Sequence, residues 1–393
     1  MSAMEQVKFF LTRNLRQSGI YIAFAAIIGL FAVLTDGKLL SEQNVTNVVV
    51  QNSYILILAI GMVIVIIGGH IDLSVGSVVA FTGAIAGVVI VRMDMPWWVG
   101  LLAALLVGAL VGVWQGFWVA FVGIPAFIVT LAGMLIFRGA AMITLGNTQI
   151  SPFPSEFRSI ASGYLNGYLG GDGFDVFTLV IGGIGVALFA FAQWRTRMGR
   201  IAYKQNVEAF PLFILKILVV GAVVMAFAQR MAFYKGLPVV LVIMGFLVLI
   251  YVLVTKRTVF GRHVYAIGGN LHAATLSGIK VKWVNFWIFV NMGVLSALAG
   301  VVFTARLNLA NPKAGTMFEL DAIAAAFIGG AAVTGGVGTV IGAIVGGLIM
   351  GVMNNGMSLM GVGIDYQQAI KGLVLLLAVA FDVYNKRRAG GGK

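Results

Sequence analysis

Long apolar segments separated by short polar ones make up most of the chain. A helix that crosses a bilayer needs about 17–25 apolar residues. Segments close to this length lie at residues 19–34, 53–67, 75–91, 97–119, 125–143, 176–194, 211–228, 237–254, 284–304 and 366–383. The pattern predicts an all-α, polytopic transmembrane helix bundle of about 10–12 spans, with residues 1–393 forming one transmembrane domain.

One apolar block, residues 322–353, is too long for a single crossing and is interrupted by a glycine-rich run from Gly329 to Gly338. Glycine in a helix interior is unfavourable because it loses more conformational freedom than other residues. The block is therefore predicted to be broken there, either into two crossings or into a re-entrant pair of half-helices.

Basic residues are concentrated in alternate polar segments. If the N-terminus is inside, the inside segments hold Lys8, Arg13, Arg16, Arg195, Arg197, Arg200, Lys204, Lys256, Arg257, Arg262, Lys280, Lys282, Lys386, Arg387, Arg388 and Lys393. The outside segments hold fewer, namely Lys38, Arg92, Arg158, Arg230, Lys235, Arg306 and Lys313. Because short loops rich in Lys and Arg stay in the cytoplasm, both termini are predicted to be cytoplasmic. Residues 195–210 and 255–283 then form cytoplasmic loops, and residues 144–175, rich in Gly, Ser and Pro, form an external loop.

The composition agrees with this topology. Hydrophobic residues make up 60% of the chain and charged residues 10%, far from the balance of a soluble domain. The excess of 26 Lys and Arg over 13 Asp and Glu lies in short gaps between apolar runs, which favours contact with membrane lipid and not with nucleic acid. The chain has no cysteine and three histidines, so thiol chemistry is excluded and no metal site is predicted.

Two glycine stripes recur at the spacing that brings helix backbones close together. They are Gly108, Gly112 and Gly116, and Gly338, Gly342 and Gly346. Packing within the bundle is the favoured interpretation, and a dimer contact is the alternative.

The chain carries no sign of its own energy source or of catalysis. No GxxxxGK segment is present to wrap phosphates, and no catalytic residues are predicted because no paired carboxylates or Ser/His/acid set can be assembled. Transport is therefore favoured over an enzyme activity, with no cofactor in this chain. If ATP drives it, another chain binds the ATP.

Asp72 lies between two predicted spans, in the sequence from Gly68 to Ser77. One hypothesis makes it the proton or sodium site of an ion-coupled secondary transporter. The favoured alternative is structural: Asp72 caps a helix that begins near Leu73, where its charge complements the helix dipole.

A neutral hydrophilic solute needs polar side chains and aromatic faces along its path. Those at helix ends and breaks are predicted to line a translocation path, although each alone is more often a packing residue: Gln51, Asn52, Asp72, Ser74, Trp114, Asn291, Asn354 and Asn355.

Several motifs together resemble one family, the permeases of bacterial ATP-driven importers for ribose, xylose, galactose and related monosaccharides. They are IDLSVGS (71–77), PAFIVTLAGMLIFRG (125–139), GRHVYAIGGN with AATLSGI (261–279), ELDAIAA (319–325) and NNGM (354–357). Residues 176–232 look like an added pair of spans, as in xylose-type and multiple-monosaccharide permeases.

The resemblance implies a multi-pass inner-membrane permease that works by alternating access. It implies three protein partners: a second copy of this chain, a cytoplasmic ATPase with two fused nucleotide-binding halves that holds ATP and Mg, and an extracytoplasmic sugar-binding protein. Related permeases carry nucleosides or furanone-type signals, so those cargoes stay open.

The inside loop at 255–283 resembles the family's ATPase-coupling element. The matching residues are His272, Ala273, Ala274, Gly278 and Ile279. Small residues there would let a short surface helix seat in a cleft of the ATPase. His272 stands where the family often has Glu, so a charge-assisted contact to the ATPase is expected to be lost or replaced.

Overall fold

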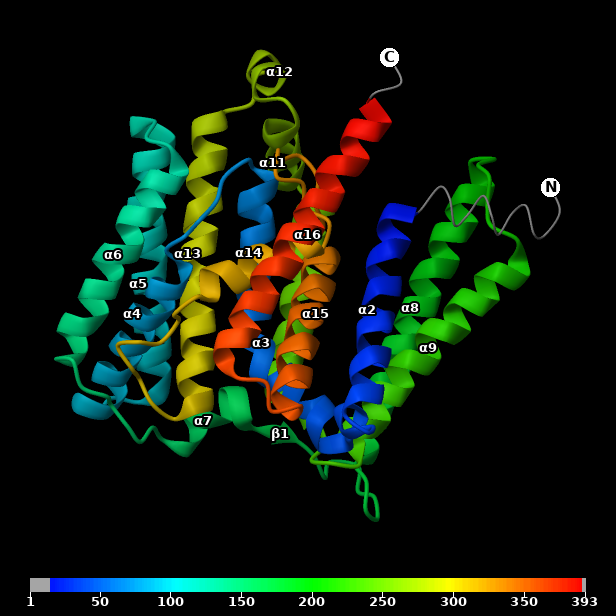
Figure 1. The fold of residues 1–393 in the computed structure, drawn as a ribbon, viewed down its shortest axis with the longest axis horizontal. Helices are drawn as coiled ribbons and strands as arrows, with labels where there is room; N and C mark the ends of the chain where they lie inside the picture. Colours follow the sequence, from blue (N-terminus) through cyan, green and yellow to red (C-terminus); the bar gives the residue numbers. More distant parts are fainter. Residues whose placement is uncertain (1–14, 391–393) are drawn as a thin grey trace.

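In a computed structural model of the protein, which describes residues 15–390 and the side chains of residues 19–380, the apolar segments form a bundle of helices (Figure 1). The helices are α2 (Leu15–Leu34), α3 (Glu42–Ile67), α4 (Val75–Gly87), α5 (Trp97–Phe117), α6 (Ala126–Leu145), α7 (Ser155–Ser162), α8 (Val176–Ala202), α9 (Phe210–Ala232), α10 (Val239–Arg257), α11 (Val259–Gly269), α12 (Leu271–Leu276), α13 (Val281–Leu307), α14 (Phe318–Ile328), α15 (Val340–Leu359) and α16 (Ile364–Gly390). A π-helical turn extends α4 over Val88–Arg92 and α5 over Trp118–Val122.

The predicted transmembrane bundle is confirmed. Within the described residues, nine helices are long and apolar enough to cross a membrane, and α2 adds a shorter apolar helix over Gly19–Leu34. The basic residues Lys8, Arg13 and Lys393 lie outside the described residues, and the cytoplasmic location of the termini stays a prediction. Below, the two ends of the bundle are called the α7 end and the α12 end.

Two long helices, α3 and α13, form the centre of the bundle and run in opposite directions (Figure 1). Residues 57–60 of α3 are completely buried. Each central helix is followed in the chain by a short helix and then a longer one, α4 and α5 after α3, and α14 and α15 after α13. Each central helix also packs on the pair that follows the other one: α3 packs on α14 and α15, and α13 packs on α4 and α5. This arrangement is an inverted internal repeat of the kind found in many transporters.

The glycine stripes make these exchanged contacts possible. A Cβ added to Gly112 would lie 2.5 Å from the backbone oxygen of Phe289 on α13, and one added to Gly346 would lie 2.1 Å from that of Ala325 on α14. The interpretation of both stripes as packing within the bundle is therefore confirmed.

Helix α4, which with its π-helical turn is long enough to cross a membrane, and the half-helix α14 begin close together. Each is preceded by a non-helical link, residues 68–74 before α4 and residues 308–317 before α14. At about 1.5 Å per residue, the 11 residues of α14 reach only about half of the roughly 30 Å of a bilayer core. The block at 322–353 is thus a half-helix, a glycine-rich turn and the long helix α15, and not two full crossings.

The segment 144–175 is more ordered than the predicted loop. It contains α7 and the strand β1 (Tyr164–Leu165), which pairs antiparallel with β2 (Leu237–Pro238). Phe153 and Phe157 are buried and stacked, with ring centroids 4.9 Å apart. The apolar residues of α7 therefore close one end of the bundle.

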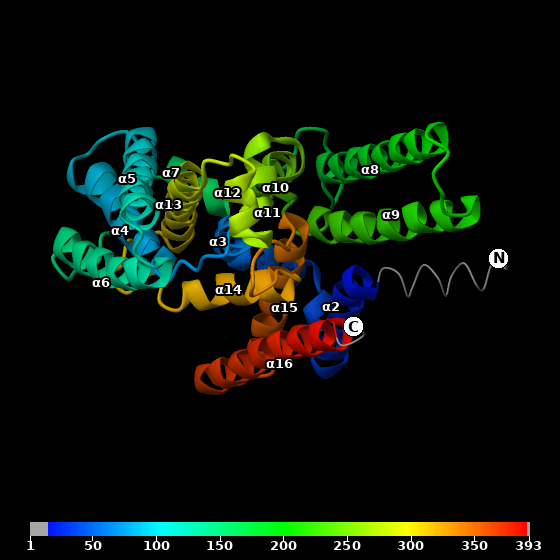
Figure 2. The same ribbon diagram turned by 90° about the horizontal axis from the view of Figure 1, so that it is seen from above.

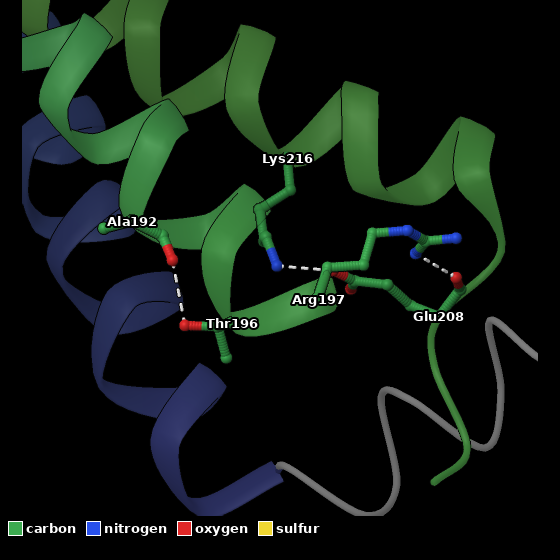
Figure 3. Close-up of polar contacts among 5 residues, drawn as sticks. All are labelled: Ala192, Thr196, Arg197, Glu208 and Lys216. Carbon is green, nitrogen blue, oxygen red and sulfur yellow. Dashed lines mark hydrogen bonds and ion pairs between the residues drawn. The ribbon is translucent and has the colours of Figure 1, made fainter. Parts of the chain in front are cut away.

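Helices α8 and α9 form a hairpin that stands to one side of the bundle (Figure 2). The predicted loop at 195–210 is shorter than expected, because α8 continues to Ala202 and α9 starts at Phe210. Near the turn, the Lys216 ammonium lies 2.5 Å from the Glu208 carboxylate, and Arg197 donates to the Glu208 backbone oxygen at 2.5 Å (Figure 3). These contacts join the two helices where the chain reverses.

The segment 255–283 holds two helices, α11 and α12, where one short surface helix was predicted. Helix α12 projects from the end of the bundle opposite α7 (Figure 1).

Candidate functional site

A buried polar network surrounds the link that precedes α4. The Asp72 carboxylate accepts hydrogen bonds from the Ser74 amide at 2.8 Å and from the Ser74 hydroxyl at 2.6 Å. The Gln115 amide on α5 donates to the Ser74 hydroxyl oxygen at 2.5 Å, and the Thr130 hydroxyl on α6 donates to the Ile71 carbonyl at 3.3 Å. The network therefore holds the link against two neighbouring helices.

Asp72 and Ser74 are buried, with 2% and 0% of their surface exposed. Helix α4 begins at Val75, which agrees with the predicted span at 75–91 and lies two residues after Leu73. The prediction that Asp72 caps this helix was wrong, because the N-cap is Ser74 and no side-chain cap bond is formed. Asp72 instead binds the Ser74 amide and hydroxyl and so stabilises the turn ahead of the helix. Polar groups buried in this way must be hydrogen-bonded to be tolerated.

Charged side chains hold the half-helix α14 and the link before it. Arg138 on α6 donates to the carbonyl oxygens of Pro312, at 2.9 Å, and of Ala314. Lys371 on α16 forms an ion pair with Asp321 in the first turn of α14, at 3.0 Å. The half-helix is thus fixed from α6 on one side and from α16 on the other.

Helix α14 lies between α6 and α16 (Figure 2), and the surface over it carries polar side chains. Lys313 and Thr316 are exposed there, and Glu319 is half-buried. Ionisable residues at membrane depth face protein or a water-filled space and avoid lipid. We call this region, defined by Lys313, Thr316, Glu319, Asp321 and Lys371, the α14 polar face.

The remaining predicted path residues do not gather around this link. Asn44 and Asn355 exchange two side-chain hydrogen bonds, at 2.8 and 2.9 Å, which join α3 to α15. Asn52, also on α3, lies against Gly351 of α15. On the same helices, Gln51 accepts a bond from Arg306 through its backbone oxygen at 3.4 Å, and the Asn354 side-chain oxygen is buried with no hydrogen bond to the described residues.

Asn291 and Trp114 lie elsewhere. The Tyr251 hydroxyl on α10 donates to the Asn291 side-chain oxygen, and Trp114 packs edge-on against Phe137 with ring centroids 5.6 Å apart. Of the eight residues, Asp72 and Ser74 lie together in the network at the link, and the other six lie outside that network. A common role in a path stays a prediction.

The contacts of Thr130 and Tyr251 and the Lys371–Asp321 ion pair were not predicted from the sequence. A polar or charged residue within an apolar span was the available signal, but its partner lies far away in the sequence and cannot be identified from spacing. Within the described residues, no group of three or more His, Cys, Asp and Glu side chains is placed to hold a metal ion.

A cavity of about 400 Å³ adjoins the link before α4. Its walls include Gly69, His70 and Ile71 of the link and residues 123–127 at the start of α6. The His70 ring lies 5.7 Å from the Phe289 ring, and its Nε2 atom is buried with no hydrogen bond to the described residues.

The residues predicted to couple to an ATPase lie on and beside α12. His272, Ala273 and Gly278 are exposed, Ala274 is buried beneath them and Ile279 is half-buried. Leu276 at the tip is 78% exposed. Exposed apolar side chains on a short projecting helix are typical of a protein-binding surface.

Comparison with known proteins gives one family. The sequence model of the family described as "Branched-chain amino acid transport system / permease component" matches residues 44–379. The xylose transport system permease protein XylH of Haemophilus influenzae is 40% identical over 377 residues, covering 95% of this chain and 98% of the relative. XylH of Escherichia coli K12 is 40% identical, covering 94% and 93%. The ribose import permease protein RbsC of H. influenzae is 33% identical over 384 residues, covering 98% of each. No solved structure matches the chain.

Proposed function

Because the chain belongs to the branched-chain amino acid transport system / permease component family, we propose that it is the permease subunit of an ATP-binding-cassette importer that carries a monosaccharide across the inner membrane. The observation that carries the proposal is the 40% identity to a xylose permease over 95% of the chain. The lower identity to a ribose permease, 33%, favours xylose or a similar sugar as the cargo. The role is transport, and ATP hydrolysis is assigned to a partner chain.

In this proposal, two copies of the chain face each other across the α14 polar face, and the sugar passes between them. The contacts of Lys371 and Arg138 support this location, because they concentrate polar groups on a surface that would be unfavourable in lipid. The N-terminus of the half-helix α14 would supply backbone amides for sugar hydroxyls. Alternating access would then be a rocking of the two inverted repeats.

In this proposal, the ATPase and the sugar-binding protein bind opposite ends of the bundle. An ATPase with two fused nucleotide-binding halves, holding ATP and Mg, binds α12, whose exposed Ala273 and Leu276 fit an apolar cleft. An extracytoplasmic sugar-binding protein binds the α7 end, where β1 and β2 make an ordered surface. This assignment makes the α12 end cytoplasmic.

The proposal is tested by reconstituting the chain in liposomes with its ATPase and binding protein. We expect sugar uptake that requires all three proteins and ATP. Uptake by this chain alone, driven by an ion gradient, would overturn the proposal.

A variant of α12 tests the coupling surface. The variant is not placed at Gly278, because Gly278 has a φ of +80° and any side chain there is strained. Ala273→Trp adds bulk at an exposed helical position instead. We expect Ala273→Trp to fold normally and to lose ATP-driven uptake, while Thr275→Ala, also exposed on α12, keeps it.

A further inference from the structure

Three backbone segments meet without side chains between them at the start of the link that leads to Asp72. The Gly336 amide of the glycine-rich turn donates to the Ile67 carbonyl at the end of α3, at 2.9 Å. Gly268, in the last turn of α11, fits against both: a Cβ added there would lie 1.7 Å from the Ile67 oxygen and 2.5 Å from the Gly336 nitrogen. Gly335 completes the contact, since its added Cβ would lie 3.2 Å from the Cα atoms of both Gly268 and Gly69. We call Ile67, Gly268, Gly335 and Gly336 the glycine junction.

The junction is joined to α12 through a single residue. Asn270 ends α11, because its amide donates to the Ala266 carbonyl at 3.0 Å. The same residue starts α12, because its side-chain oxygen accepts from the Ala273 amide at 2.9 Å. No flexible linker separates the two helices, so α12 cannot move far without moving the last turn of α11.

On its other side, the junction leads into the polar network. Five residues after Ile67, Asp72 holds Ser74, which is bound by Gln115 of α5. The Tyr265 hydroxyl on α11 donates to the Gly338 carbonyl at 2.7 Å, which ties α11 to the glycine-rich turn before α15. The C-terminal half of α11 is therefore in contact with both inverted repeats.

We propose that the glycine junction transmits movement of α12 to the link before α4, and that Gly268 is the positioning residue for this transmission. The inference rests on the proposed function, because the partner ATPase is what would move α12. Side chains at such a contact would change rotamer and absorb a displacement, whereas backbones in direct contact must move together. Coupling between distant sites needs a contiguous set of packed elements of this kind.

The experiment compares Gly268→Ala with Gly269→Ala in the full chain, reconstituted with ATPase and binding protein. A Cβ at position 269 meets nothing within 4 Å, so Gly269→Ala is a matched control in the same helix turn. The readouts are sugar transported per ATP hydrolysed, the ratio of sugar-stimulated to basal ATP hydrolysis, and co-purification with the ATPase. We expect Gly268→Ala to lower transport per ATP roughly 2- to 30-fold with the complex assembled, and Gly269→Ala to match the wild type.

The outcomes separate the two proposals. Wild-type chain that gives no ATP-driven uptake refutes the proposed function itself. If the wild type transports and assembled Gly268→Ala is equally well coupled, the junction proposal alone is overturned. If Gly268→Ala does not assemble, Tyr265→Phe decides, because it removes one hydrogen bond and adds no atom to the junction. Reduced transport per ATP with unchanged basal hydrolysis supports the proposal, and unchanged coupling overturns it.

Discussion

The backbones of Gly76 and Gly315 touch at the point where α4 begins and the link to the half-helix α14 passes. A Cβ added to Gly76 would lie 2.1 Å from the Gly315 carbonyl oxygen, and one added to Gly315 would lie 1.9 Å from the Gly76 carbonyl oxygen. The two repeats therefore meet backbone to backbone, and the spacing of α4 and the link before α14 is fixed by two residues without side chains.

We expect Gly76→Ala to lower the free energy of unfolding in detergent by about 1–3 kcal/mol, because the added methyl group must push the Gly315 backbone away. Gly245→Ala in α10 is the control, since a Cβ there meets nothing within 4 Å. It should leave the free energy of unfolding unchanged or raise it by up to about 1 kcal/mol through helix propensity. Equal effects of the two substitutions would contradict the close contact.

The reciprocal amide pair of Asn44 and Asn355 can be measured by a double-mutant cycle with Asn44→Ala and Asn355→Ala. Both hydrogen bonds are lost in either single variant. We expect a coupling free energy between about 0.6 and about 1.7 kcal/mol, the average and the maximum for side-chain hydrogen bonds between membrane helices. Additive effects on the free energy of unfolding would mean that the pair does not hold α3 to α15.

Replacing only Lys371 of the Lys371–Asp321 ion pair should lower the free energy of unfolding more than replacing both residues. In Lys371→Met, the Asp321 carboxylate, 16% exposed, is left without its partner. The double variant Lys371→Met with Asp321→Asn leaves no uncompensated charge and is expected to recover part of the lost free energy of unfolding. Arg230→Met, in the exposed pair with Glu42, serves as a control and should change it by less than about 1 kcal/mol. A double variant less stable than Lys371→Met would contradict the assignment.

Asp175, the N-cap of α8, should make the α7 end of the bundle sensitive to acid. Burial raises its pKa, but hydrogen bonds from Thr178, Gly167 and Phe177 outweigh burial and hold the pKa below its usual value of 3.8. A carboxylate with a lowered pKa stabilises the fold fully above its unfolded pKa, and this stabilisation is lost as the pH falls through the folded pKa.

Hydrogen exchange of the amides at 163–178 between pH 3 and pH 6 tests this. We expect the protection of these amides in the wild type to fall more steeply toward pH 3 than in Asp175→Asn, which has no charge to lose. Asp172→Asn, an exposed acid nearby, should behave like the wild type. Identical pH profiles for wild type and Asp175→Asn would show that the cap contributes nothing.

Asp72→Asn separates a structural role from ion coupling. The asparagine side-chain oxygen can accept the same two hydrogen bonds from Ser74 that the carboxylate oxygen accepts. We therefore expect Asp72→Asn to keep ATP-driven uptake, whereas Asp72→Leu, which cannot accept them, should reduce it. Loss of uptake in Asp72→Asn together with a pH-dependent or sodium-dependent wild type would favour an ion-coupled carrier.

The spans could be predicted because lipid demands long apolar helices, and the sequence records that length directly. The break in the block at 322–353 was predicted, since the glycine-rich run marks it, but neither alternative was right in full: α14 is a half-helix and α15 is long enough to cross a membrane. The order within residues 144–175 was not predictable in the same way. Strand β1 needs Leu237 and Pro238 as its partner, and a two-residue strand has no periodic signal.

Only those contacts of the candidate site that join residues close together in the sequence could be predicted. Asp72 and Ser74 are two residues apart and form a local hydrogen-bonded turn, which their residue types favour. Their link to Gln115, and the clamp of Arg138 on Pro312, join residues from distant spans. Such pairings depend on which helices become neighbours, and the inverted repeat that decides this is not visible in single spans.

The α8–α9 hairpin has a consequence for the surrounding bilayer. It packs on the bundle through α9 and α3, while Leu188, Phe191, Leu218 and Val223 stay exposed along its length. Such side chains contact acyl chains. The hairpin therefore lengthens the perimeter of the protein in the membrane and increases the number of lipid molecules that contact it. A nanodisc around this chain should therefore retain more lipid molecules than one around a variant lacking residues 176–232.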